Sequence, residues 1–285
     1  MKLGIRLHDL GKGRSQEILR KAKDKGFDYI QLVFLKAFED ENNNPIPFSK
    51  EAALKVKTQL DEIGLKVAML GAYFNPVHSN KEKVKNSIEY FKNHLRYAHL
   101  LNCEYVGTET GSYNDDKWTY NPKNQTEEGF VDTLSVFKEL VEEAQKDKTT
   151  ILIEPAWGHV IYSTHCLQRI KDELASPYVK FTIDLFNLLY IGNYSSYKEI
   201  FEEALQTFKE EIKIVHLKDF YVDNNKLVQC GLGKGLIDFK FIIETIKKYA
   251  PEATLIFEGV VKEDIDTSYT LINKLINNSN TNLDI

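Results

Sequence analysis

Four side chains that can bind a metal ion each stand at the end of a short apolar run. They are Glu154, Asp184, His216 and Glu258. Taken singly, such a residue is more often part of a salt bridge or a helix cap, but burying three carboxylates together is costly unless a cation neutralises them. The four together therefore favour one bound divalent metal ion. An imidazole with three carboxylates suits Mn²⁺ or Mg²⁺, and Co²⁺ or Zn²⁺ stay open as alternatives.

Further polar and aromatic residues follow the ends of similar runs and are candidates for binding a substrate. They are His8, Tyr73, Glu109, Trp157, His159, Asn187 and Lys218. Side chains alternate along a strand, so Lys218 is expected to point the same way as His216, whereas Leu217 and Asp219 point the other way. An aromatic residue in such a position can cover the apolar face of a ligand, although packing in the core explains any one of them equally well.

The segment Gly231-Leu232-Gly233-Lys234-Gly235 suggests a second kind of binding site. Backbone amides in a glycine-rich turn near the start of a helix can surround an anion such as phosphate. A turn whose glycines merely let the chain bend is at least as good an explanation. The sequence leaves both alternatives open.

The elements that must position these residues alternate regularly along the chain. Eight short β-branched or apolar runs are expected to be strands, at residues 3–7, 29–34, 66–70, 105–108, 150–154, 180–184, 213–216 and 254–258. Amphipathic helices are expected between them, among them residues 50–63, 81–101, 127–146 and 238–250. Ser49, Ser79 and Asp238 are suitable N-caps for three of these helices.

Eight such units without a break in composition predict a (β/α)8 barrel of the α/β class, a single domain over residues 1–285. An open doubly wound sheet is the weaker alternative, because no GxGxxG follows the first strand. In a barrel the carboxyl ends of all strands meet at one face, where the polar loops 39–47 and 112–124 are also expected. The asparagine-rich tail, residues 277–285, is expected to be frayed.

The composition limits the class of protein. Hydrophobic residues make up 42% and charged residues 28%, which is ordinary for a globular protein. The net charge of −5 argues against nucleic acid as a partner. The chain has no long apolar run and no signal-peptide pattern, so a cytoplasmic protein without a membrane partner is expected. The three cysteines are odd in number and widely spaced, which favours reduced thiols. A homo-oligomer stays open.

Motifs at the strand ends together resemble the xylose-isomerase-like TIM barrel superfamily, and within it the sugar phosphate isomerase/epimerase family, over nearly the whole chain. They are Ile153-Glu154-Pro155, Ile183-Asp184, Val215-His216-Leu217-Lys218-Asp219, Gly231-x-Gly233-x-Gly235-x-Ile237-Asp238 and Phe257-Glu258-Gly259. The resemblance implies that Glu154, Asp184, His216 and Glu258 bind one divalent metal ion. Many members carry a histidine three residues after the aspartate of strand six, where this chain has Asn187, which keeps a donor and an acceptor but does not titrate.

The resemblance also implies an enzyme of carbohydrate metabolism, a metal-dependent isomerase or epimerase of a sugar or sugar phosphate. A metal that grips a carbonyl oxygen and an adjacent hydroxyl stabilises the enediolate left when the neighbouring C–H loses its proton. Glu154 would take that proton from one face, and Glu258 would return one from the other face, which inverts the carbon. Transfer between neighbouring carbons on one face would give aldose–ketose isomerisation instead.

Three alternatives remain beside this interpretation. A dehydratase of cyclic polyols, of the inosose type, would use the same base and expel a hydroxyl group. An apurinic endonuclease with three zinc ions is a poorer match, because Asn75, Glu109 and Asn187 stand where it needs further histidines. A carbohydrate-binding barrel without catalytic activity could retain the metal. In the first and third cases the partner is again a small sugar or polyol.

Overall fold

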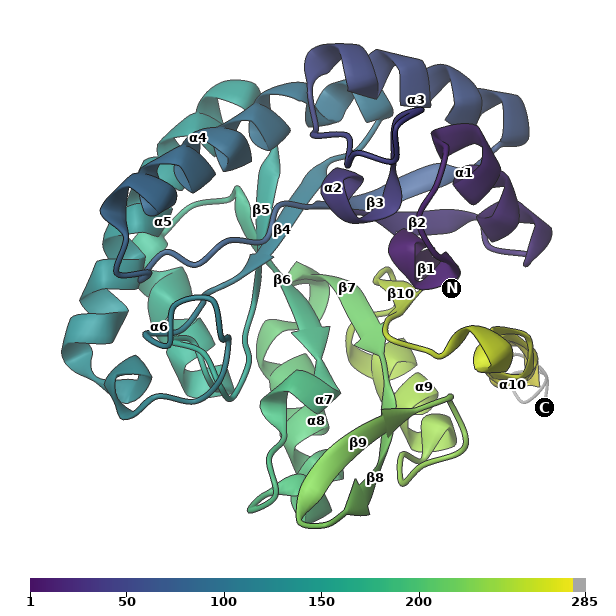
Figure 1. Ribbon diagram of the computed structural model, residues 1–285. Helices are drawn as coiled ribbons and strands as arrows, with labels where there is room; N and C mark the ends of the chain where they lie inside the picture. The colour runs from purple at the N-terminus through teal and green to yellow at the C-terminus, as the bar shows by residue number, and fades with distance from the viewer. Residues whose placement is uncertain (279–285) are drawn as a thin grey trace.

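Eight short runs of mostly buried residues form the parallel strands of a closed barrel in the computed structural model, which describes residues 1–278 (Figure 1). The strands are β1 (Lys2–Arg6), β2 (Tyr29–Leu32), β3 (Lys66–Gly71), β4 (Tyr105–Glu109), β5 (Thr150–Glu154), β6 (Val179–Asp184), β7 (Ile212–Leu217) and β10 (Thr254–Phe257). The barrel closes where β1 pairs with β10, in parallel register from Lys2 with Thr254 to Ile5 with Phe257. The predicted (β/α)8 barrel is confirmed.

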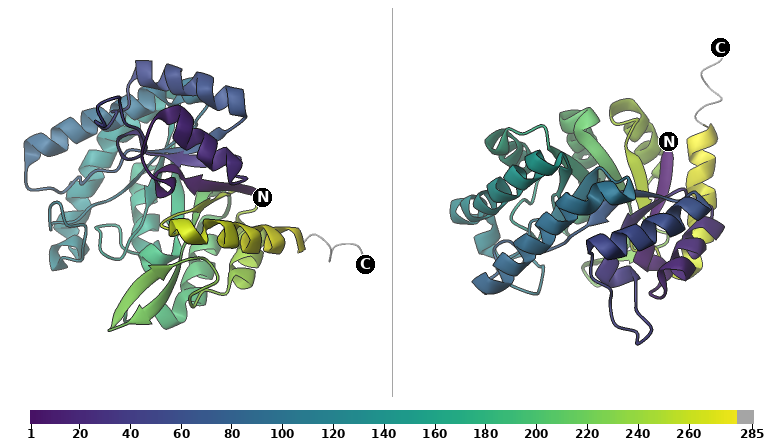
Figure 2. Two further views of the ribbon diagram at one scale, coloured as in Figure 1. Left: turned by 45° about the vertical axis from the view of Figure 1, so that its right-hand side comes forward. Right: turned by 90° about the horizontal axis from the view of Figure 1, so that it is seen from above.

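The helices surround the barrel on its outside (Figure 2). They are α1 (Ser15–Asp24), α2 (Phe34–Ala37), α3 (Lys50–Ile63), α4 (Lys81–Tyr97), α5 (Glu127–Asp147), α6 (Thr164–Leu174), α7 (Leu185–Leu188), α8 (Tyr197–Phe208), α9 (Phe239–Tyr249) and α10 (Ile265–Asn278). α10 closes the ring of helices beside the start of the chain, where the Tyr269 hydroxyl donates to the Gly26 carbonyl at 3.0 Å. No helix in the described part of the chain is both long and apolar enough to cross a membrane.

Two of the three predicted N-caps are confirmed. Ser49 accepts a hydrogen bond from the Ala52 amide, and Asp238 caps α9. The prediction for Ser79 is wrong, because Asn80 caps α4. Ser79 instead donates its amide and its hydroxyl to the carboxylate of Asp115, each at 2.8 Å.

Several predicted boundaries are also wrong by a few residues. Leu7 begins a short 3-10 helix, η1 (Leu7–Leu10), and Phe34 begins α2, although both were expected in strands. Both side chains are fully or almost fully buried, and an apolar run does not by itself distinguish a strand end from a buried turn of helix. α10 continues through Asn278, so the first two residues of the predicted tail are helical, while 279–285 lie outside the described residues.

A two-stranded antiparallel hairpin, β8 (Asp219–Asp223) and β9 (Lys226–Cys230), lies between β7 and α9 and was not predicted. It extends from the lower edge of the barrel in Figure 1. Its turn consists of Asn224 and Asn225, whose φ angles of 45° and 62° are the left-handed values that a two-residue hairpin turn requires.

Candidate active site at the barrel mouth

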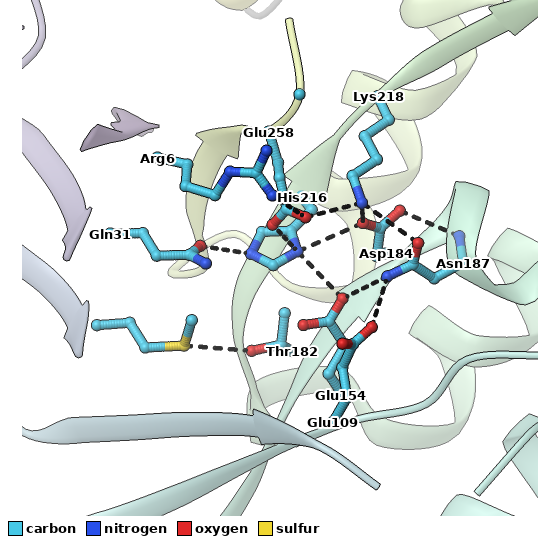
Figure 3. Close-up of polar contacts among 12 residues, drawn as sticks. Arg6, Gln31, Glu109, Glu154, Thr182, Asp184, Asn187, His216, Lys218 and Glu258 are labelled. Atoms are coloured by element: carbon cyan, nitrogen blue, oxygen red, sulfur yellow. Dashed lines mark hydrogen bonds and ion pairs between the residues drawn. The ribbon is translucent and has the colours of Figure 1, made fainter. Parts of the chain in front are cut away.

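The four predicted metal ligands come together at the carboxyl ends of four strands (Figure 3). Glu154 and Asp184 are the last residues of β5 and β6, His216 is the last but one of β7, and Glu258 directly follows β10. All four side chains are buried. The parallel register explains this arrangement, because Asp184 pairs with His216 and His216 pairs with Ile256 on β10, two residues before Glu258.

One nitrogen of His216 faces the three carboxylates. His216 Nδ1 lies 3.3 Å from Glu154 Oε1, 3.4 Å from Asp184 Oδ2 and 3.0 Å from Glu258 Oε2. The ligand atoms of Glu154, Asp184 and His216 all lie within 4.8 Å of one another. This spacing is compact enough for one ion to contact all three groups, so they could hold a metal.

The other side of the ring assigns its tautomer. Fully buried Gln31 donates its amide to the Tyr73 hydroxyl at 2.8 Å, so its carbonyl oxygen is left to face His216 Nε2 at 2.7 Å. Nε2 therefore carries a proton, so Nδ1 is the nitrogen left either to bind a cation or to carry a second proton. The three carboxylates around Nδ1 call for positive charge at this point, either a bound cation or a second proton on the ring.

The buried oxygens are consistent with a bound ion. In the described chain the group facing Glu258 Oε2 is His216 Nδ1, at 3.0 Å, the nitrogen that would also face a bound ion. If no ion is bound, His216 must carry the positive charge: burial lowers its pKa, but Glu258 and Glu154 outweigh burial and raise that pKa well above its usual value. One imidazole nitrogen with carboxylate oxygens is a donor set that divalent ions accept, so the residues fit a metal.

Two permanent cations hold the remaining oxygen of Glu258. Lys218 Nζ and Arg6 Nη1 each lie 2.8 Å from Glu258 Oε1, and Lys218 Nζ also lies 2.7 Å from Asp184 Oδ2. Asp9 accepts from Arg6 at 2.7 and 2.9 Å. Burial alone would raise the pKa of Glu258, but His216, Lys218 and Arg6 hold it well below its ordinary value.

Asn187 connects the groups on the other side of the site. Its amide nitrogen donates to Glu154 Oε1 at 2.8 Å and to Glu109 Oε1 at 3.3 Å, and its oxygen accepts from Lys218 at 3.2 Å. Burial raises the pKa of Glu154, and burial together with the charge of Glu154 raises the pKa of Glu109 well above its usual value. The carboxylates of the site therefore differ: Glu258 stays ionised, whereas Glu154 and Glu109 hold a proton more readily.

A cavity of about 290 Å³ opens onto these carboxylates. Its lining residues are Arg6, His8, Lys36, Tyr73, Glu109, Trp118, Glu154 and Glu258. Three of the predicted substrate-binding residues, His8, Tyr73 and Glu109, thus line it. Lys218 and Asn187 contact the carboxylates instead.

The two remaining candidates lie outside the lining of this cavity. His159 is buried, with its ring edge-on to Trp118 and its Nδ1 3.9 Å from Glu109 Oε1. Trp157 stacks against Tyr120 and Tyr190, with ring centroids 5.5 and 3.9 Å away. Trp157 therefore serves in an aromatic stack among the loops and lines a different pocket.

The glycine-rich segment does not offer its amides to an anion. Fully buried Asp219 already accepts from them: its Oδ2 from Gly233 and Gly235, each at 2.9 Å, and its Oδ1 from Ile237 at 3.1 Å. A side chain at Gly235 would place its Cβ 2.2 Å from the Phe220 carbonyl oxygen. The structure contradicts the phosphate alternative and supports the tight bend.

Four residues of the site were not identified from the sequence. They are Arg6, Gln31, Lys36 and Trp118. Arg6 and Gln31 are polar residues inside apolar runs that form strands, and that conflict is the signal that could have found them. Lys36 and Trp118 stand in connecting segments, where the sequence carries no comparable pattern.

The sequence matches the model of the xylose isomerase-like TIM barrel family over residues 19–271. The chain therefore belongs to this family, and the resemblance to the superfamily is confirmed. A search of curated proteins gives no match.

Three solved structures illustrate the similarity of the fold. A D-tagatose 3-epimerase-like protein is 20% identical, with a TM-score of 0.76 and coverage of 99% of each chain. The IOLI protein with a bound zinc atom is 17% identical, with a TM-score of 0.72 and coverage of 98% of this chain and 99% of its own. The probable 3-DHS dehydratase AsbF of Bacillus anthracis is 12% identical, with a TM-score of 0.72 and coverage of 96% and 99%.

Proposed function

We propose that this chain is a metal-dependent isomerase or epimerase of a small sugar or sugar derivative, which moves a proton at a carbon next to a carbonyl group. The observation that carries the proposal is that Glu154 and Glu258 line one cavity beside a His216 nitrogen that is free to bind a cation. At about 290 Å³ the cavity lies at the small end of the range for ligand pockets, which suits a single sugar unit. The similarity to a D-tagatose 3-epimerase-like protein is consistent with this class.

Glu154, Asp184, His216 and Glu258 would hold the divalent ion. When bound, the ion polarises the carbonyl group of the substrate and makes the neighbouring C–H more acidic. Gln31 contributes by keeping the proton on His216 Nε2, so that Nδ1 faces the carboxylates. Lys218 and Arg6 contribute by keeping Glu258 ionised.

Glu154 and Glu258 differ in pKa, so they suit different steps of proton transfer. Glu154 has the raised pKa, so it can take a proton and hold it, and the bond from Asn187 keeps its oxygen oriented. Glu258, which stays ionised, is the partner that would take a proton on another side of the reacting carbon, and Glu154 would then supply the proton that it holds. Proton transfer by both carboxyl groups, on different sides, would invert that carbon. Proton transfer by Glu154 alone would instead move the proton between neighbouring carbons, which is isomerisation.

An apurinic endonuclease is disfavoured by the surroundings of Asn75. Its amide nitrogen donates to the carbonyls of Ser112 and Asp115 at 2.6 and 2.8 Å, and its oxygen accepts from the Val77 amide. Asn75 therefore stabilises the loop after β4 and takes no part in the carboxylate cluster. A dehydratase remains the second candidate, because it would use the same carboxylates.

Exchange of substrate hydrogen with solvent tests the reaction. The protein with Mn²⁺ is incubated in D₂O with D-fructose, D-tagatose, a ketose phosphate and an inosose, and deuterium next to the carbonyl is followed by NMR. We expect exchange with at least one of them, reduced by a factor of about 10² or more in Glu154→Gln. Glu104→Gln, an exposed glutamate just before β4, is the matched control. Loss of water without exchange into recovered substrate would favour the dehydratase, and no reaction with any compound would contradict an enzyme of this class.

Metal content tests the ligands separately. Protein purified without chelator should contain about one divalent ion per chain by elemental analysis, since such sites bind when their ligands are deprotonated. His216→Ala and Glu258→Ala should each lose the ion while remaining folded. Retention of the ion in both variants would show that it binds elsewhere.

A further inference from the structure

The cations at the barrel mouth differ in whether they have an acidic partner. Arg6 contacts Asp9 and Glu258, and Lys218 contacts Asp184 and Glu258. Lys36, on α2, lines the same cavity but has no carboxylate within ion-pairing distance in the described chain. Its ammonium lies only over the Tyr73 ring, 5.8 Å from the centroid. Lys36 is exposed, so water solvates its charge at the edge of the cavity and the ammonium is available to pair with a ligand.

A second polar group on the same side also lacks a partner. His8 Nδ1 is a buried atom that makes no hydrogen bond with any described residue, and His8 lines the cavity. A buried nitrogen without a partner costs free energy, which a bound ligand recovers if the ring turns its Nδ1 toward the cavity. Burial, with Arg6 and Lys36 nearby, lowers the pKa of His8 to about 3, so it is a neutral hydrogen-bonding group at neutral pH.

The position of this pair relative to the carboxylates gives the orientation of a ligand. His8 and Lys36 follow β1 and β2, which are neighbours in the barrel, whereas Glu154 ends β5 on the opposite side of the ring. A sugar whose reacting carbon lies at Glu154 would extend its other end toward His8 and Lys36. The two groups would therefore meet the end of the substrate that is remote from the reaction.

We propose that Lys36 and His8 bind an acidic group, a phosphate or a carboxylate, at the end of the sugar remote from the reacting carbon. The inference rests on the proposed function, which places the reacting carbon at Glu154; Glu258 follows β10, which lies between β5 and β1 in the barrel order. An anion is favoured over a hydroxyl group because it pairs with Lys36, the lysine of the described cavity lining without a carboxylate partner, and forms a charge-assisted hydrogen bond with it. The glycine-rich turn offers no competing site, since Asp219 occupies its amides.

Binding of three related ketoses tests the inference. Dissociation constants are measured by calorimetry for D-fructose, D-fructose 6-phosphate and D-fructuronate, which differ only in the terminal group. The wild-type protein should bind one or both acids about tenfold more tightly than D-fructose, in line with one charge-assisted bond. Lys36→Met should remove that preference and leave the affinity for D-fructose within twofold. His8→Leu should weaken binding of the same acids by about threefold, and the tighter of the two acids identifies the group.

Lys12→Met is the matched control, because Lys12 is exposed, lies near enough to influence His8, and does not line the cavity. It should change the affinities by less than twofold. Equal binding of D-fructose and both acids by the wild-type protein, or equal losses for all three in Lys36→Met, would overturn the inference. The two proposals can be distinguished. Deuterium exchange with D-fructose but not with the acids would support the proposed function and contradict the acidic-group site. Binding of the acids that depends on Lys36, without deuterium exchange in any compound, would support the acidic-group site and contradict the proposed function.

Discussion

Replacing the buried carboxylate of Asp219 should destabilise the protein by an amount that its hydrogen bonds allow us to estimate. Its two carboxylate oxygens accept four backbone N–H groups, from Phe220, Gly233, Gly235 and Ile237, at 2.8 to 3.1 Å. These bonds fix the tight bend that leads from the β8–β9 hairpin into α9. Asp219→Asn keeps the size of the side chain but replaces one accepting oxygen with an NH₂ group.

The magnitude follows from the number of amides that lose their acceptor. Each oxygen of Asp219 serves two N–H groups, so whichever way the new amide turns, two donors face another donor: the buried amides of Phe220 and Ile237, or the part-buried amides of Gly233 and Gly235. Each unsatisfied buried donor costs about 1–3 kcal/mol. We therefore expect the free energy of unfolding to fall by about 3–4 kcal/mol. At about 2 °C per kcal/mol for a chain of this size, the melting temperature should fall by about 6–8 °C.

Urea and thermal unfolding, each followed by circular dichroism, measure this change. Asp223→Asn is the matched control, because Asp223 is exposed at the far end of β8 and should cost less than about 0.5 kcal/mol. A loss below 1 kcal/mol in Asp219→Asn would refute the reasoning, since it would mean that the four amides do not depend on this carboxylate. The glycine-rich turn would then be open again as an anion site.

Two further predictions concern buried polar groups. Gln31→Met removes the acceptor that holds a proton on His216 Nε2, so the metal affinity of the protein, measured by chelator competition, should fall by about 10- to 100-fold. An unchanged metal affinity would contradict this role of Gln31. Gln59→Met on α3 is the control. Burial lowers the pKa of His94, stacked on Phe48, to about 4. The unfolded chain then binds the extra proton between pH 6.5 and 4, so stability falls as pH drops, by about 2 kcal/mol from pH 7 to 5. Urea unfolding should show that His94→Phe lacks this share of the pH dependence.

The barrel was predictable because its pattern repeats. Each strand is a short apolar run followed by an amphipathic helix, and the metal-binding residue types interrupt that pattern only at strand ends. Parallel strands bring those ends to one face, so Glu154, Asp184, His216 and Glu258 could be grouped without knowledge of the loops. The hairpin was missed, although the Asn224-Asn225 pair between two alternating runs is a turn signal.

The cavity walls were less predictable, because they depend on register and on connecting segments. Gln31 faces His216 from across the barrel, next to a register shift between β2 and β3 that no periodicity reveals. Arg6 meets Glu258 only because β1 closes the barrel against β10. Lys36 comes from a helix of a single turn. Contacts of this kind join residues distant in sequence, so a reading of local pattern cannot give them.

Asn187 stands where many members of the family have a histidine, and its contacts show what the amide does in that place. A histidine there would offer at most one donor and one acceptor in the plane of a ring, whereas the amide donates to Glu154 and Glu109 and accepts from Lys218 at the same time. Asn187 also keeps a neutral group between two carboxyls whose pKa values are raised, so it connects them without adding a charge. Asn187 was expected to bind substrate, and that stays a prediction; in the described structure its polar atoms contact Glu154, Glu109 and Lys218. We infer that Asn187 positions Glu154, and we expect discrimination among substrates to depend on the cavity lining, above all on Lys36 and His8.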